Sequence, residues 1–416
     1  MSTIVVCTVV FCGCATVKRQ DGLLTKNATP LFPIGCYELP EDDADLKKMA
    51  ESGINLVRCH SKADLDRVGA LGMMGWIPLA VQSGPTDKLR QHIESVKDHP
   101  ALAVWEGPDE IIWSFTASSR LYRTRGIYKS RDEWWKQTPN AIEYSEEQAK
   151  KIMPNIHEGI QLVRTLDNNN RPFWINEALE SDMKFVRQYM DWIDITGCDI
   201  YPVKADKRNI IQMAGATERW TQISRGKPVW MVLQAFAWSE LGDYYGVKDT
   251  AYPTFAESRF MAYDVIAHGA KGILYWGSHY LKSDAFRQSL YALTSELAAL
   301  QPFMTAPEIP DIQVNVIEDT YKADEFGVRT VVRKCGREWL IILVNEDDHK
   351  HMGVEVTGLD NLNDQQLELL YGTEIAVIQH GELITRMQPY EVKVFSTSRK
   401  WETDRRDGRD FNDEDN

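Results

Sequence analysis

Two adjacent acidic residues, Asp109 and Glu110, follow a short apolar run in the segment HPALAVWEGPDEIIW, residues 99–113. A carboxyl group that donates a proton near neutral pH needs a raised pKa, and burial beside a second carboxylate raises it. Cleavage of an acetal has this requirement, because the leaving oxygen must be protonated as the bond breaks. The alternative is structural, since either residue could cap the next helix or pair with an arginine of the following loop.

Acetal cleavage also needs a second group that stabilises or traps the positively charged carbon, and later apolar runs offer further carboxylates. Glu177 ends the run in PFWINEALE, Asp199 lies in GCDIYPV, and Glu240 comes shortly after KPVWMVLQAFAW. The separation of two paired carboxyl groups would distinguish a nucleophile, at about 5 Å, from a base that activates water, at about 6.5–9.5 Å.

Short apolar runs alternate eight times with amphipathic segments between about residue 30 and residue 300. This alternation predicts repeated βα units around a parallel sheet. None of the runs is followed by a GxGxxG or GxxxxGK loop, which would cradle a phosphate in an open, doubly wound sheet. The sequence therefore predicts an α/β fold of the (β/α)8-barrel type. The expected strands are Phe32–Tyr37, Asn55–His60, Gly75–Gln82, Ala101–Glu106, Pro172–Asn176, Ile193–Tyr201, Pro228–Phe236 and Gly272–Trp276.

Four segments together resemble the retaining-type (β/α)8-barrel glycoside hydrolases of the clan A kind: the segment around Glu110, GINLVRCH, GCDIYPV and HGAKGILYWG. In that family an Asn-Glu or Asp-Glu pair ends the fourth strand, and its Glu protonates the glycosidic oxygen. The resemblance covers roughly residues 30–300 and implies that Glu110 is this acid and that the substrate is a carbohydrate. The family's nucleophile is a Glu at the end of the seventh strand, where this sequence has Gln234, and an amide cannot take that role.

Because position 234 is an amide, the identity of the second catalytic group is not determined by the resemblance. Glu177 or Asp199 could replace the missing carboxylate. The N-acetyl group of a substrate could attack instead, with Asp109 orienting it, because the Asp-Glu pair and the aromatic residues that end strands six and eight resemble the substrate-assisted hexosaminidases. A barrel that binds glycans without cleaving them is a further alternative, which the amide at position 234 favours.

Barrel enzymes place their chemistry at the C-terminal ends of the strands. Polar and aromatic residues occupy these ends in the expected barrel, and they suit a sugar, whose hydroxyl groups need hydrogen-bond partners and whose rings stack on aromatic faces. Each of them could equally be a core residue. The expected substrate-binding residues are Tyr37, Arg58, His60, Gln82, Trp113, Asn176, Tyr201, Gln234 and Trp276.

The segment from Trp113 to Tyr144 is expected to be a long loop, and long structured loops tend to be functional. It interleaves aromatic and basic residues in an otherwise acidic chain. An anionic glycan, sulfated or uronic, would suit this patch, because arginine binds such groups through paired hydrogen bonds. A lid whose aromatic side chains pack on the barrel rim is the alternative. The residues are Trp113, Phe115, Tyr122, Tyr128, Trp134, Trp135, Arg120, Arg123, Arg125, Lys129, Arg131 and Lys136.

The 416-residue chain has a formal net charge of −14. Phosphate backbones are bound mainly by Lys and Arg, so we expect no nucleic-acid partner. The nine His residues are scattered and no CxxC spacing is present, so we expect neither a metal nor a cofactor. The oligomeric state stays open.

The first residues, IVVCTVVFCGCA at 4–15, predict export, because this apolar run is too short to span a bilayer. The segment resembles a bacterial lipoprotein cleavage box, with Cys14 as the lipidated residue. We therefore expect an exported protein, in the periplasm, on the cell surface or outside the cell, that meets a membrane only through a lipid anchor at Cys14. A wrongly assigned start or a buried first strand is the alternative.

After Pro302 the pattern changes to period-two strands such as GVRTVVRK and EWLIILVNED, which predict a small antiparallel β-sandwich. The acidic C-terminal segment has almost no apolar residues and should not fold. We expect a leader at 1–20, the barrel at 28–303, the β-sandwich at 304–399 and a disordered tail at 400–416.

Overall fold

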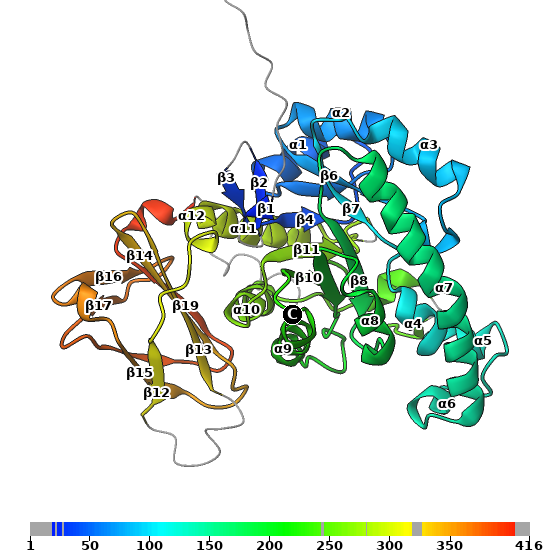
Figure 1. Cartoon of the computed structure of the whole chain (residues 1–416). Coiled ribbons are helices and arrows are strands. Elements are labelled where there is room, and N and C mark those ends of the chain that lie inside the picture. Colours follow the sequence, from blue (N-terminus) through cyan, green and yellow to red (C-terminus); the bar gives the residue numbers. More distant parts are fainter. Residues whose placement is uncertain are drawn as a thin grey trace, which may run out of the picture.

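The computed structural model describes residues 19–20, 23–26, 29–242, 245–279, 281–317 and 327–403. Eight parallel strands form a closed barrel with helices around its outside (Figure 1). Each strand overlaps one of the apolar runs, so the predicted (β/α)8 barrel is confirmed. The barrel strands are β4 (Ile34–Cys36), β5 (Leu56–Arg58), β6 (Met74–Pro78), β7 (Leu102–Glu106), β8 (Phe173–Ala178), β9 (Ile195–Asp199), β10 (Val229–Gln234) and β11 (Gly272–Trp276).

Polar caps in the sequence begin many of the outer helices. The side chains of Asp42, Ser61 and Thr86 each accept a hydrogen bond from a backbone N–H in the first turn of the helix that follows. These N–H groups have no partner inside the helix, so each cap stabilises the start. The outer helices include α1 (Asp43–Glu51), α2 (Lys62–Ala70), α3 (Asp87–Val96), α7 (Pro139–Leu166), α8 (Met183–Tyr189), α9 (Gln212–Ile223), α10 (Phe255–Ala267) and α11 (Asp284–Ala299).

Three tryptophans, Trp76, Trp174 and Trp230, fill the barrel interior. The ring of Trp174 lies 6.2 Å from that of Trp76 and 5.3 Å from that of Trp230, between centroids. Glycines leave room for these rings, because a Cβ at Gly197 would lie 2.8 Å from Trp174 and one at Gly272 would lie 2.7 Å from Trp230. These side chains therefore fill the barrel interior, and the strand ends are where a barrel of this kind leaves space for a site.

A three-stranded antiparallel sheet, which was not predicted, precedes the barrel: β1 (Arg19–Gln20), β2 (Leu23–Lys26) and β3 (Thr29–Leu31). Its Leu24 packs against the same cluster as the interior tryptophans. β1 begins at Arg19, within the last two residues of the expected leader, and residues 1–18, Cys14 among them, lie outside the described residues. No helix in the described part of the chain is long and apolar enough to cross a membrane.

The segment between β7 and α7 is helical rather than a loop. It forms α4 (Ile111–Thr116), α5 (Arg120–Arg123) and α6 (Asp132–Trp135), which project from one end of α7 (Figure 1). Phe115, Tyr128 and Trp134 are buried. Most of its aromatic residues therefore pack into the fold, as the lid alternative expected.

The C-terminal β-domain consists of two antiparallel sheets that enclose their own core, so the predicted β-sandwich is confirmed. Strands β17 and β18 were not predicted, because they are short and separated by turn residues. One sheet contains β12 (Gln313–Val316), β15 (Met352–Thr357) and β18 (Leu383–Met387); the other contains β13 (Val328–Cys335), β14 (Glu338–Asn345), β19 (Val392–Ser396), β16 (Gln366–Leu369) and β17 (Ile375–Val377).

The start of the predicted disordered tail is corrected. A 3-10 turn spans Arg399–Trp401, and the ring of Trp401 packs 4.9 Å from that of Phe303 at the end of the barrel domain. Trp401 is the apolar residue that holds this stretch in place. The remainder of the expected tail, 404–416, lies outside the described residues.

Candidate active site

A cavity of about 770 Å³ opens at the C-terminal ends of the barrel strands. Four acidic side chains line it: Glu180 and a group of three that we call the mouth carboxyls, Asp109, Glu110 and Asp199. Aromatic and basic residues form much of the remaining wall. They include Tyr37, Trp113, Arg120, Arg131, Tyr201, Lys204, Lys207, Trp238 and Trp276.

Glu110 is held in an unusual backbone conformation. It precedes α4 with φ 49° and ψ 37°, in the left-handed region. Such a conformation costs a non-glycine residue about 1–2 kcal/mol. Hydrogen bonds fix it on both sides, from the Glu110 N–H to the Asn176 carbonyl at 3.0 Å and from the Ser114 N–H to the Glu110 carbonyl at 2.9 Å. Strain that the fold maintains in this way is typical of functional positions.

The mouth carboxyls form one hydrogen-bonded group. Asn176, buried at the end of β8, donates from Nδ2 to Asp109 at 3.0 Å and to Asp199 at 2.9 Å. The carboxyl groups of Asp199 and Glu110 are hydrogen-bonded to each other. Two carboxylates in this contact cannot both be ionised, so the pair holds a proton.

Burial, and then the neighbouring Asp109 carboxylate, raise the pKa of Glu110 to about 7. Burial, with Glu110 and Asp109 nearby, raises the pKa of Asp199 well above its ordinary value. Glu110 is thus protonated in part near neutral pH, which a general acid requires.

Glu106, the last residue of β7, was not among the predicted site residues. It is fully buried below the mouth carboxyls and accepts hydrogen bonds from Arg58 Nε at 2.7 Å and Trp76 Nε1 at 3.0 Å. Burial raises the pKa of Glu106 to about 8. Its position at a strand end is the signal that could have revealed it. Arg58, predicted to bind sugar, is instead paired with Glu106 and lies 5.2 Å from the centre of the Tyr37 ring.

Glu177 is not brought to the cavity. Its side chain is fully buried and accepts hydrogen bonds from the backbone N–H of Ile112 at 3.1 Å, from Ser181 at 2.7 Å and from Tyr189 at 3.2 Å. Burial raises the pKa of Glu177 to about 8. Side chains alternate along a strand, so Asn176 faces the barrel mouth while Glu177 faces the helix layer, where it caps α4. The prediction of Glu177 as the second catalytic carboxylate conflicts with this placement.

Gln234 is likewise used by the fold. Its amide accepts from Val203 N at 3.0 Å and donates to Val203 O at 2.9 Å and to Phe236 O at 3.0 Å. These bonds fix the segment after β9 onto the end of β10, and Gln234 does not line the cavity. Glu240 is also occupied by the fold, since it accepts from Tyr252 and from the backbone of Lys282 and Ala237.

Aromatic side chains form a continuous wall of the cavity. Tyr201 and Trp276 are stacked with centroids 5.3 Å apart and an interplanar angle of 25°. Trp238, which was not predicted, lies 6.4 Å from Tyr201 at a steep angle. Tyr37 and Trp113 line the same space. His60 and Gln82, by contrast, are not among the residues that line this cavity.

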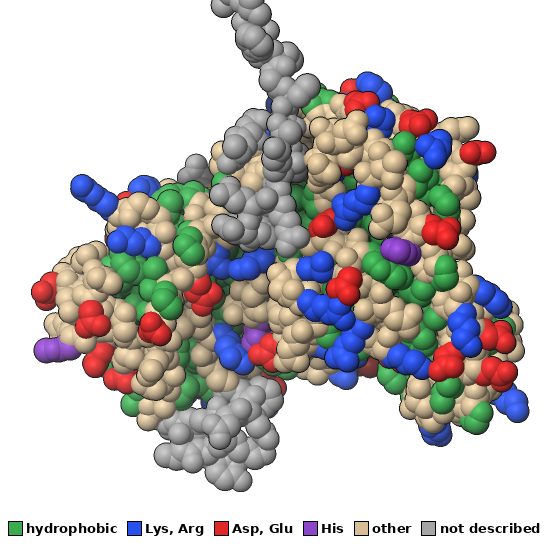
Figure 2. Space-filling model, viewed as in Figure 1, with side chains coloured by type: hydrophobic (Ala, Val, Ile, Leu, Met, Phe, Trp, Pro, Cys, Tyr) green, Lys and Arg blue, Asp and Glu red, His purple; other side chains and the backbone are tan. Residues whose placement is uncertain are grey.

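Four basic side chains also line the cavity: Arg120, Arg131, Lys204 and Lys207. Lys204 lies with Nζ 4.4 Å from the centre of the Trp238 ring. No ion pair within the described residues engages any of the four. Figure 2 shows Lys and Arg mingled with Asp and Glu over α5 and α6, so the predicted basic patch is mixed at the surface. Of the basic residues of that patch, Arg120 and Arg131 line the cavity. Lys204, Lys207 and the acidic Glu180 also line the cavity but were not predicted; the lysines follow the end of β9 by five and eight residues, and Glu180 follows the end of β8 by two.

No family model and no curated protein matches this sequence. Solved structures match its fold. A glycoside hydrolase aligns over 92% of this chain and 96% of its own with a TM-score of 0.53, at 13% identity. A family 5 glycoside hydrolase from Bacteroides vulgatus ATCC 8482 aligns over 95% and 97% with a TM-score of 0.52, also at 13% identity.

A β-galactosidase from the psychrophilic Marinomonas ef1 aligns less well, with a TM-score of 0.46 and 13% identity over 64% of this chain and 60% of its own length, which is too loose to carry a conclusion. The chain therefore shares the barrel-plus-β-domain fold of known glycoside hydrolases. At such low identity the likeness establishes the fold, and chemistry has to be argued from the site.

Proposed function

We propose that this protein is a glycoside hydrolase that cleaves an O-glycosidic bond with Glu110 as its general acid. One observation carries the proposal: a hydrogen-bonded, proton-sharing pair of carboxyl groups, Glu110 and Asp199, lines an open cavity with stacked aromatic walls. The raised pKa of Glu110, about 7, suits a group that must be protonated before the reaction and ionised after it.

In the proposed reaction Glu110 transfers its proton to the glycosidic oxygen while the bond from that oxygen to the anomeric carbon breaks. The bonding electrons leave with the oxygen, and the sugar becomes an oxocarbenium-like cation. Negative charge on Asp109 and on the newly ionised pair would stabilise that cation in the partly buried site. The stacked Tyr201 and Trp276 offer an apolar face to the ring. Water completes hydrolysis at the anomeric carbon.

The group that traps the anomeric carbon has to come from beyond this pair. A nucleophilic carboxylate stands about 5 Å from the acid, and direct contact between Asp199 and Glu110 is closer than that. We therefore place Asp199 as the partner that shares the proton of Glu110. Glu180 lines the same cavity, and its negative charge contributes to the raised pKa of Glu110, so it is the protein carboxylate best placed for the second role.

The same observation favours a second candidate, a substrate-assisted N-acetylhexosaminidase. In that mechanism the carbonyl oxygen of the substrate's own N-acetyl group attacks the anomeric carbon, and a carboxylate orients the group. Asp109 is adjacent to Glu110, lines the cavity and is held by Asn176, as such a role requires.

We further propose that the substrate is an anionic glycan, sulfated or uronic. The support is the set of four basic side chains in the cavity wall. Arg120 and Arg131 come from the segment between β7 and α7, and Lys204 and Lys207 come from the segment after β9. Arg120, Arg131 and Lys207 are exposed and Lys204 is half-buried, and no ion pair among the described residues engages them, so their charges are available to an anion at the cavity mouth.

The test is hydrolysis of aryl glycosides and polysaccharides, neutral, N-acetylated and sulfated, by the wild type, Glu110→Gln, Glu180→Gln and the matched surface control Glu94→Gln. Turnover that is lost in Glu110→Gln and kept in the control supports the proposal. Cleavage restricted to N-acetylated substrates and unaffected by Glu180→Gln selects the substrate-assisted mechanism. Glycan binding without turnover by the wild type would contradict the proposal and identify a binding protein.

A further inference from the structure

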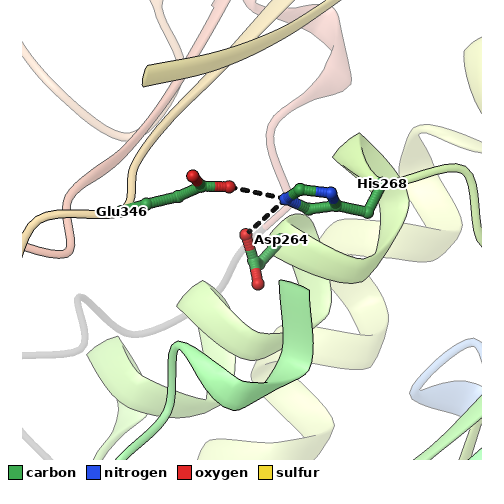
Figure 3. A group of neighbouring side chains, drawn as sticks. All are labelled: Asp264, His268 and Glu346. Atoms are coloured by element: carbon green, nitrogen blue, oxygen red, sulfur yellow. Dashed lines mark hydrogen bonds and ion pairs between the residues drawn. The ribbon is translucent and has the colours of Figure 1, made fainter. Parts of the chain in front are cut away.

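A second group of titratable side chains lies at the junction between the barrel and the β-domain. Asp264 and His268 stand at the end of α10, and Glu346 directly follows β14 of the β-domain (Figure 3). We call these three residues the junction cluster. None of them lines the cavity, so the junction cluster is separate from the mouth carboxyls.

The three side chains converge on one point. Nε2 of His268 lies 2.5 Å from Oε1 of Glu346 and 3.6 Å from Oδ1 of Asp264. One oxygen or nitrogen atom from each residue lies within 4.8 Å of the other two. Asp264 and His268 are four residues apart, so the helix presents both on one face.

Asp264 is the observation that points to a bound ion. Its side chain is 0% exposed, and among the described residues neither of its oxygens has a hydrogen-bond donor other than the neighbouring Glu346 carboxyl, with which Asp264 would have to share a proton. A buried carboxylate without donors is strongly disfavoured unless a proton or a cation compensates it. Arg329, whose charge also acts on Asp264, is half exposed and is bonded to Glu346 at 3.3 Å and to Glu218 at 3.1 Å.

The orientation of His268 also fits a ligand. Its Nδ1 lies 2.9 Å from a carboxylate oxygen of Glu218, which is outside the junction cluster. A histidine that binds a metal through one ring nitrogen almost always donates the other N–H to a carboxylate or carbonyl, which fixes the tautomer. With the Nδ1–H held by Glu218, a metal ion that displaces the proton between Nε2 and Glu346 would find the Nε2 lone pair directed at Asp264 and Glu346.

We propose that the junction cluster binds a divalent transition-metal ion, with Zn²⁺ as the best fit, through Asp264, His268 Nε2 and Glu346. One imidazole and two carboxylates, with a water as fourth ligand, make a tetrahedral set that suits Zn²⁺ better than Mg²⁺ or Ca²⁺, which prefer oxygen ligands. Two ligands of such an ion stand about 3.3 Å apart, so the Glu346 carboxylate has to move from His268 by less than about 1 Å.

The ion would join the two domains, because two ligands come from the barrel and one from the β-domain. Its role is structural, and it does not depend on the proposed glycosidase activity. No metal was expected from the sequence, since the histidines are scattered, but a single histidine suffices when a helix and a distant strand end supply the carboxylates.

The experiment uses the full chain, treated with a chelator and then titrated with ZnCl2 by calorimetry, with melting temperature recorded in parallel. Asp264→Asn and His268→Ala test the site. His349→Ala is the matched control, because His349 also lies beside two acids, Asp347 and Asp348, but at an exposed position. Asp264→Asn removes a buried charge, so that variant should fold without metal.

We expect the wild type and His349→Ala to bind one Zn²⁺ per chain, with a rise in melting temperature of about 2–5 °C at saturation. Both cluster variants should bind at least tenfold more weakly and lose the rise. The proposal is overturned if the wild type binds no Zn²⁺ saturably, if Asp264→Asn and His268→Ala bind as the wild type does, or if MgCl2 raises the melting temperature as much as ZnCl2.

Discussion

The two sides of α4 show how differently one residue type can be used. Glu110 precedes this helix on the side of the cavity, and Glu177 receives the N–H groups of its first turn on the packed side. Burial raises the pKa of both, to about 7 and about 8. Glu110 borders open volume and touches another carboxyl group, whereas Glu177 is enclosed by hydrogen-bond donors. A raised pKa therefore does not by itself distinguish a catalytic carboxyl group from one that caps a helix. The distinguishing property is whether the side chain lines the cavity.

The largest expected effect is on turnover. Glu110→Gln removes the proton donor with little change of shape and should lower kcat by about 10²–10⁴-fold. Glu177→Gln, the matched variant on the other side of α4, should keep kcat within about tenfold of the wild type. Steady-state kinetics of both, with melting curves to show that they are folded, measures the contrast. An equal loss of activity in two folded variants would contradict the assignment of Glu110 as catalytic and Glu177 as structural.

The second largest expected effect is on the free energy of unfolding. Glu177→Ala leaves the N–H groups at the start of α4 and the Ser181 hydroxyl without their buried acceptor, so the free energy of unfolding should fall by about 1–3 kcal/mol. Glu110→Ala removes no comparable set of bonds and should change it by less. Urea unfolding followed by circular dichroism gives both values. A larger loss in Glu110→Ala would reverse the structural assignment of the two residues.

The basic residues of the cavity wall should have smaller effects, on substrate binding. Arg120→Ala combined with Lys204→Ala should raise KM for a sulfated substrate by about tenfold, which corresponds to about 1.4 kcal/mol. The same variant should leave KM for a neutral substrate unchanged. Salt should weaken the wild type's preference for the sulfated substrate. Equal KM changes for both substrates would remove the argument for an anionic glycan.

The smallest expected effect is a displaced pH profile. The acid form of Glu110 is the active one, so activity should be present below its pKa and decline as the pH rises through about 7. The Asp109 carboxylate contributes to raising that pKa, so Asp109→Asn should move the alkaline limb of kcat/KM to lower pH. A limb that stays in place would show that burial alone sets the pKa.

The barrel could be predicted because its strands are continuous apolar runs, each of which overlaps a run named from the sequence. The long segment after Trp113 could not, since short helices stabilised by buried Phe115 and Trp134 look like a polar loop when their partners are unknown. The N-terminal sheet was missed for the same reason, because its strands depend on pairing with one another.

Site residues were predictable where their position along a strand decides whether the side chain lines the cavity. Glu110, Asp199 and Trp276 follow strand ends and line the cavity. The catalytic role predicted for Glu177 conflicts with the structure, because side chains alternate along the strand and the neighbouring Asn176 is the one that faces the mouth. Gln234 was expected to reach the cavity, but its amide is hydrogen-bonded to backbone groups of Val203 and Phe236, and no sequence pattern indicates these bonds. The junction cluster needed a helix and a strand 78 residues apart to meet, which only tertiary structure supplies.

The two sets of tryptophans give the molecule an optical readout. Trp76, Trp174 and Trp230 are sealed inside the barrel, while Trp113, Trp238 and Trp276 stand in the cavity wall. Iodide should quench the fluorescence of the second set and spare the first until the barrel opens. A bound glycan that stacks on the wall should shield that second set, so quenching of intact protein can report occupancy before any product is detected.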